Sequence, residues 1–178
     1  MRKQTTLVLS LLALVLLSFS CSKRNDAESF PVLDEKNLTP CPANANCEFL
    51  FTEQADVEPV PGIFKTGAYR LFWSRVVRQS MSSVLYIKAP MKGNSFTLNQ
   101  SDITNGKIEI SRSCPACLFV ASKLVDGYVK GINLSPGKPA DQTSWIVEAQ
   151  LISESMYGTP LRDTVSVKQY FYPNFVYN

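Results

Sequence analysis

The sequence predicts an all-β domain, an antiparallel β-sandwich or barrel of about eight or nine short strands. Three observations support this fold class. Short stretches of β-branched and aromatic residues recur along the chain, turn residues separate them, and no long stretch has the periodicity of an amphipathic helix. A parallel α/β fold would need such helices between its strands. We therefore expect a sheet with one buried and one solvated face.

The expected strands follow one another between residues 41 and 178. Asn105-Gly106 is a strong turn signal, and the stretch after it alternates cleanly between apolar and polar residues. Two stretches rich in proline and glycine, 57–67 and 134–143, are expected to be loops. The expected strands are 47–52, 69–78, 84–87, 96–98, 107–111, 118–120, 128–133, 145–151 and 164–171.

The aromatic residues are expected mainly in the core, because they alternate with polar residues along their strands. The alternative is a platform on which a sugar ring stacks. Its candidate residues are Trp73, Trp145, Tyr69, Tyr86 and Tyr128. The aromatic C-terminal run, 170–177, is expected to complete the core as the last strand. If this run is exposed instead, it would form a contact surface.

The first 21 residues have the features expected of an export signal. Arg2 and Lys3 are followed by an apolar run over 7–17 and then by Ser20-Cys21. At 1.5 Å per residue, this run of about 11 residues covers roughly 17 Å, too short for a membrane core of roughly 30 Å. Ser20-Cys21 resembles the lipobox of type II signal peptides, in the relaxed form common in Bacteroidota-type lipoproteins. It departs from the preferred pattern at Ser18, where that family favours leucine.

The resemblance implies that Cys21 is the lipidation site. In that family the cysteine thiol receives a diacylglycerol, the chain is cut before the cysteine, and the new amine is acylated. The alternative is an ordinary signal peptide, which would leave an unpaired thiol in an exported protein. Surface lipoproteins of this kind carry an acidic cluster after the cysteine, whereas this chain has Lys23 and Arg24 there. We therefore expect a lipid-anchored protein of the cell envelope, facing the periplasm rather than the cell surface.

Three regions are expected along the chain. Residues 1–20 are the signal helix, 21–40 a lipidated flexible tether and 41–178 a single β-rich domain. The tether is expected because its first residues are polar and because Pro31 and Pro40 interrupt regular structure. The remaining length suits one domain with its own core.

Composition excludes several functions. The chain has no histidine, which excludes Ser-His-Asp and Cys-His catalysis as well as histidine-ligated metals. The net charge of +3 includes Arg2 and Lys3, which leave with the signal, so the mature chain has no basic excess for nucleic acid. No catalytic motif, cofactor or phosphate-binding loop is indicated. Glu148 is expected on the outer face, where Lys130 or Lys168 can pair with it across the sheet.

Four further cysteines are disulfide candidates: Cys41, Cys47, Cys114 and Cys117. Three pairings are possible, one local and two that link the N-terminal segment to the Cys114 region. Two functional alternatives use the same residues. Cys114-x-x-Cys117 has the spacing of a thiol-redox pair, and four thiolates together would suit Zn²⁺. The strand pattern after Cys117 lacks the helix that a thioredoxin-like motif requires.

These observations predict a cell-envelope lipoprotein with a non-enzymatic binding or structural role. Its expected contacts are the membrane, through the lipid, and a partner protein or glycan. The alternative is a thiol-redox or zinc-binding protein that uses Cys114 and Cys117. A hydrolase would have to use carboxylate or Ser-Lys chemistry, for which the sequence shows no motif.

Overall fold

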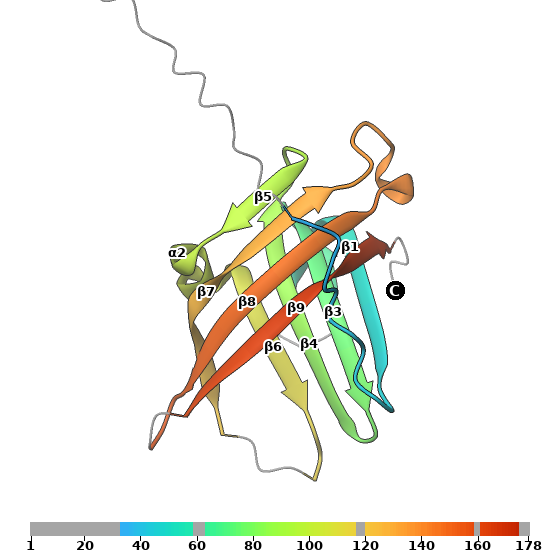
Figure 1. Ribbon diagram of the computed structural model, residues 1–178. Helices are drawn as coiled ribbons and strands as arrows, with labels where there is room; N and C mark the ends of the chain where they lie inside the picture. The colour runs from blue at the N-terminus through green and yellow to red at the C-terminus, as the bar shows by residue number, and fades with distance from the viewer. Residues whose placement is uncertain (1–32, 59–62, 117–119, 159–160, 175–178) are drawn as a thin grey trace, which may run out of the picture.

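The computed structural model describes residues 33–58, 63–116, 120–158 and 161–174. These residues form a nine-stranded sheet that curls around an apolar interior (Figure 1). The strands are β1 (Asn46–Val57), β2 (Phe64–Thr66), β3 (Tyr69–Arg78), β4 (Met81–Pro90), β5 (Ser95–Leu98), β6 (Ile108–Ser113), β7 (Ser122–Asn133), β8 (Trp145–Ser155) and β9 (Arg162–Pro173). The all-β prediction is confirmed. The strands are longer than expected, since six of them have 10 to 12 residues.

The strand order is β5-β7-β8-β9-β1-β3-β4-β6, and β2 pairs with the end of β1. Neighbouring strands are antiparallel, as predicted, with one exception. β1 and β9 are parallel, so the sheet is mixed rather than antiparallel throughout. This pair joins a C-terminal half, β5-β7-β8-β9, to an N-terminal half, β1-β3-β4-β6.

Two segments differ locally from the prediction. Asn105-Gly106 does turn the chain, with φ of 77° at Gly106, but inside the π-helical turn η1 (Ile103–Lys107) that follows the short helix α2 (Gln100–Asp102). It makes no hairpin, because β5 pairs with β7 while β6 pairs with β4. The expected strand at 118–120 falls largely outside the described residues. Val120 is not in a strand, and β7 begins at Ser122.

The core lies on the concave face of the sheet. Rings from both halves meet there: Phe72 of β3 lies 5.5 Å from Trp145 of β8 and 5.6 Å from Phe171 of β9, centroid to centroid. Trp145 and Phe171 are 1% and 0% exposed, so the core role predicted for them is confirmed. Tyr172, the next residue of the C-terminal run, is 54% exposed, and 175–178 lie outside the described residues.

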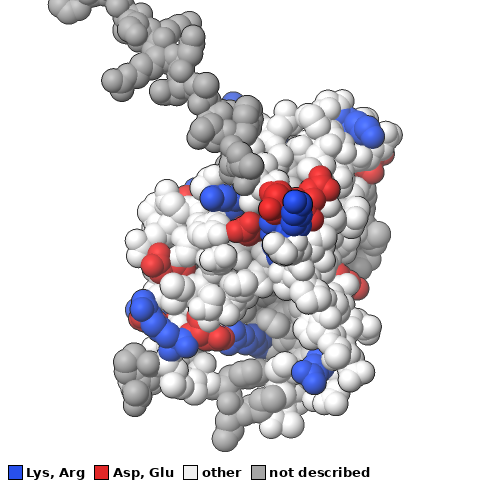
Figure 2. All heavy atoms as spheres, in the orientation of Figure 1, with Lys and Arg blue, Asp and Glu red and all other residues white. Residues whose placement is uncertain are grey.

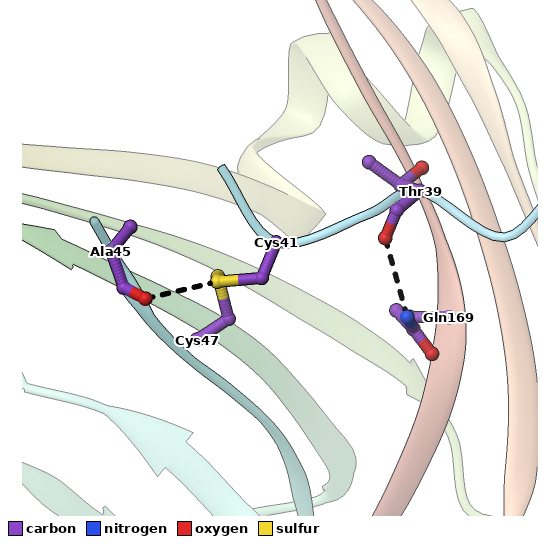
Figure 3. Close-up of a disulfide and its surroundings, with 5 residues drawn as sticks. All are labelled: Thr39, Cys41, Ala45, Cys47 and Gln169. Carbon is purple, nitrogen blue, oxygen red and sulfur yellow. Dashed lines mark hydrogen bonds between the residues drawn. A yellow bond between two sulfur atoms is a disulfide. The ribbon is translucent and has the colours of Figure 1, made fainter. Parts of the chain in front are cut away.

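The described part of the segment before β1 contacts strand β9. The N–H of Thr39 donates to the carbonyl of Lys168 (2.8 Å), and the N–H of Lys168 donates to Thr39 Oγ1 (2.9 Å). Gln169 Nε2 donates to the Thr39 carbonyl at 3.2 Å (Figure 3). Lys168 also pairs with Asp34, and this hydrogen bond lowers the pKa of Asp34. Asp34 and Thr39, which belong to the expected tether, therefore contact β9 of the domain.

Gly127 is the position in β7 at which a side chain is least tolerable. Its φ is 131°, and a Cβ there would lie 2.1 Å from the backbone oxygen of Gln150. Gly137 also has a positive φ, of 84°, but its Cβ would meet nothing within 4 Å. We expect Gly137→Ala to lower the free energy of unfolding by about 1 kcal/mol, from backbone strain alone.

Gly127→Ala adds a clash with the backbone of β8 to the same kind of strain. It should therefore lower the free energy of unfolding by about 3 kcal/mol or more. Urea titration of both variants measures the difference. Equal costs would show that β7 and β8 are not packed as closely as described.

Candidate functional site

The cysteines that the sequence singled out are partly placed by the structure. Cys41 and Cys47 form a disulfide with Cα atoms 5.9 Å apart (Figure 3), which is the local one of the possible pairings. Cys114 is also disulfide-bonded. Cys117 and the lipidation candidate Cys21 lie outside the described residues.

The disulfide bears on the zinc alternative. It consumes the thiolates of Cys41 and Cys47, two of the four that a Cys₄ site needs. Within the described ranges, no group of three or more His, Cys, Asp or Glu residues is placed to hold a metal ion.

The sugar-stacking alternative is contradicted at Trp73 and Tyr86. These rings lie on the outer face of β3 and β4, where Phe64 of β2 covers them with centroid distances of 4.7 and 6.1 Å. They are 5% and 3% exposed, so neither offers a free face to a sugar. A hollow of about 850 Å³ lies beside these rings. The rings that line it, those of Phe64, Trp73 and Tyr86, already pack against one another.

Several ionised groups of the sheet are paired with protein partners. As predicted, Lys168 pairs with Glu148 across the sheet, at 3.8 Å. The Tyr128 hydroxyl donates to Glu148 at 2.5 Å, and this hydrogen bond, together with burial, raises the pKa of Tyr128. On β3, Arg70 is 7% exposed and donates to Glu53 at 2.8 Å. These pairs have the geometry of structural contacts between neighbouring strands.

The candidate site lies where the curled sheet is open. Strand β6 pairs with β4 along one edge and ends the sheet, and residues of β6 and of the start of β7 line a common cavity beyond its other edge. That half, Ser122–Tyr128, pairs with β8 on one side only, because the short β5 covers β7 no further than Val129. We call the space between β6 and this part of β7 the seam.

Main-chain groups of β6 point into the seam. In the two-residue hairpin of β3 and β4, Arg78 and Met81 flank the turn and form a hydrogen-bonded pair. Counting from that pair, the residues of β4 direct their main-chain N–H and C=O groups alternately toward β3 and toward β6. The residues of β4 whose groups point toward β6 lie opposite Glu109, Ser111 and Ser113. The N–H and C=O groups of Ile110 and Arg112 therefore face away from β4, into the seam.

A cavity of about 440 Å³ occupies the seam. Its apolar lining comes from the inner side of the sheet, where Ile108 and Ile110 of β6 and Leu124 of β7 adjoin the core. Its polar lining includes Arg112 and Lys123. Figure 2 shows this face of the molecule hollowed toward its lower end, where Figure 1 places the end of β6 and the start of β7.

The upper end of the seam is closed by α2 and η1. Asn99 caps α2 by accepting from the N–H groups of Ser101 and Asp102, and Asp102 accepts from the N–H of Asn99 in return. This capping box places Ile103, 3% exposed, in the core. Gln100 Nε2 donates to the carbonyl of Val125 at 3.3 Å and so occupies one group of the β7 edge.

The charge at the lower end is mainly basic. Arg112 lies 3.5 Å from Asp163 and is about one-third exposed. Lys123 is exposed, and among the described residues it forms no ion pair. Its cross-strand neighbour Glu154 pairs instead with Arg162, at 2.8 Å. An acidic group entering the seam would meet both Arg112 and Lys123.

Asp102 makes the closure of the seam dependent on pH. The hydrogen bond from Lys107 (2.6 Å) is the main reason that the pKa of Asp102 lies below its ordinary value of 3.8, and the Asn99 N–H contributes as well. A lowered pKa stabilises the folded state at higher pH, and the gain is lost as the pH falls through that pKa. We expect Asp102→Asn to lower the free energy of unfolding by about 1 kcal/mol at pH 7.

The cost of this substitution should shrink below pH 3.8. Urea titrations between pH 7 and pH 3 measure it, and Asp141→Asn on the exposed turn Ala140–Gln142 is the matched control. A cost independent of pH would mean that the carboxylate charge has no part in the cap.

Comparison with protein-family models, with curated proteins and with solved structures found no match to this chain. Sequence reasoning also missed the seam. The residues that line it look like ordinary strand residues, and only the order of strands in space shows that their edges lack a neighbour.

Proposed function

We propose that this chain is an exported, lipid-anchored lipoprotein whose domain binds a ligand at the seam, without catalysing a reaction. The observation that carries the binding role is the cavity itself. At about 440 Å³ it falls within the range of small ligand sites, and it combines an apolar lining with main-chain and basic groups.

Anchoring is supported by the N-terminal sequence and by the length of the connection. Asp34 is held on β9, so twelve residues, 22 to 33, link Cys21 to the domain. At roughly 3.5 Å per extended residue, the domain would lie within about 40 Å of the lipid. Among the described residues, no helix is long and apolar enough to cross a membrane.

Export is supported by the disulfide chemistry. Disulfides persist in oxidising compartments such as the periplasm and are rare in the reducing cytosol. Cys41–Cys47 joins the segment before β1 to the second residue of that strand and lies outside the apolar core. An envelope location accounts for this bond and for the export signal together.

The anchor is tested by substitution of Cys21. In a Gram-negative host fed with labelled palmitate, we expect the natural chain to carry label and to sediment with membranes. Cys21→Ser should lose the label and fail to sediment. Ser18→Leu restores the residue preferred by the type II signal family and should speed processing. A natural chain without label would contradict lipidation.

The cavity is tested with 1-anilinonaphthalene-8-sulfonate, an apolar dye with an acidic group. We expect its fluorescence to rise with the full mature chain carrying Cys21→Ser. Ala121→Trp, an exposed position that lines the cavity, should lower this signal at least fivefold. Gln150→Trp, on the outer face of β8, is the control and should leave it unchanged. Equal signals in both variants would remove the seam as the binding site.

A further inference from the structure

We infer that the ligand of the seam is an extended peptide, which adds to the free edge of β6 as an extra strand. The inference rests on the proposed function for the place of binding, and it names the chemistry of the partner. Strand addition gives affinity through main-chain hydrogen bonds and specificity through alternate side chains.

The edge of β6 has the hydrogen-bonding groups that a peptide strand requires. Ile110 and Arg112 direct their N–H and C=O groups into the seam. Among the described residues, neither makes a main-chain hydrogen bond outside the ladder with β4. An acyl chain in the same place would exclude water from these groups without pairing them, at about 1–3 kcal/mol for each unpaired group. A peptide would pair them.

The seam is wider than the spacing of two paired strands. Paired strands lie about 4.8 Å apart, so two edges separated by one inserted strand lie about 9.6 Å apart. Almost all Cα atoms of β6 lie more than 8 Å from those of β7, which is too far for the two strands to pair directly.

The length of the β6 edge limits the length of the peptide. β6 has six residues, and on the facing side the cavity is lined by Ser122, Lys123 and Leu124 of β7, below the part of β7 that α2 contacts. The seam therefore suits a peptide segment of about six residues, in the range of an ordinary strand.

The edge of β6 is the better of the two for strand addition. Its register with β4 is unbroken over all six pairs. The facing half of β7 has a register shift between Leu124 and Asp126, and Gln100 already occupies the carbonyl of Val125. Irregularities of this kind discourage pairing along an edge.

The lining specifies the peptide's side chains. On the inner side, Ile108, Ile110 and Leu124 would meet every second residue, so these residues of the peptide should be apolar. The alternate residues would face solvent beside Ser111. Arg112 and Lys123 at the lower end favour an acidic residue or a C-terminal carboxylate there. The partner is therefore an extended segment that alternates apolar and polar residues and has an acidic end.

The test uses an array of synthetic hexapeptides that alternate Val, Ile, Leu or Phe with Thr or Ser and end in Asp. The probe protein is the full mature chain carrying Cys21→Ser. We expect members of the array to bind and to shift the amide NMR signals of Ile110 and Arg112. The best peptide is then N-methylated at alternate residues, which removes main-chain donors but keeps every side chain. In one of the two methylation registers, binding should fall at least tenfold.

Two variants of one residue test the protein side. Ile110→Pro removes the N–H that faces the seam and should abolish binding while leaving the β4 ladder in place. Ile110→Val keeps the N–H and should bind within about threefold of the natural chain. The N-methylated peptides give an independent answer if Ile110→Pro does not fold.

The outcomes separate the inference from the proposed function. If no hexapeptide binds but the dye still binds at the seam, the peptide inference fails and the ligand site stands. If neither binds, both fail. Equal binding of peptides methylated in either register overturns strand addition. A dimer formed through β6, abolished by Ile110→Pro, would overturn the peptide partner in favour of a second copy of this chain.

Discussion

The parallel pairing of β1 with β9 is the contact on which the rest of the structure depends. Leu50 lies opposite Tyr172, and the N–H of Asn174 donates to the carbonyl of Phe51 at 2.8 Å. Each half of the sheet is otherwise a set of antiparallel neighbours. Because the halves are joined through β1 and β9, their far edges are left on the opposite side of the curl. The cavity at the seam follows from this arrangement.

Packing on the concave face determines how far the sheet curls. Phe72 comes from the N-terminal half and Trp145 from the C-terminal half, and their rings meet edge to face at 5.5 Å. Burial of such rings, which contributes a few kcal/mol for each, draws the halves together. Ile103 fills the upper end of the remaining gap. Among the described residues, no buried apolar side chain like that of Ile103 fills the gap between Arg112 and Lys123, and polar side chains line the cavity there instead.

Contacts between residues in neighbouring strands proved the easiest to predict. Glu148 was expected to pair with Lys130 or Lys168, and Lys168 does pair with it, because alternation within a strand decides which side chains share a face. The docking of Thr39 on β9 was missed, since its partner Lys168 is 129 residues away. Ile110 is a seam residue only because β6 ends the sheet, and no local pattern encodes that position.

The sequence by itself determined the all-β class, most strand positions and the chemistry that the absence of histidine excludes. It also predicts the export signal and the lipid on Cys21. Only the tertiary structure decided the parallel pair, the Cys41–Cys47 bond among the possible pairings, and the open edge of β6. The physical reason is the distance along the chain between the residues that determine each feature. The two-residue period of a strand is written in adjacent residues, whereas the choice of neighbouring strands depends on how the whole apolar surface is buried.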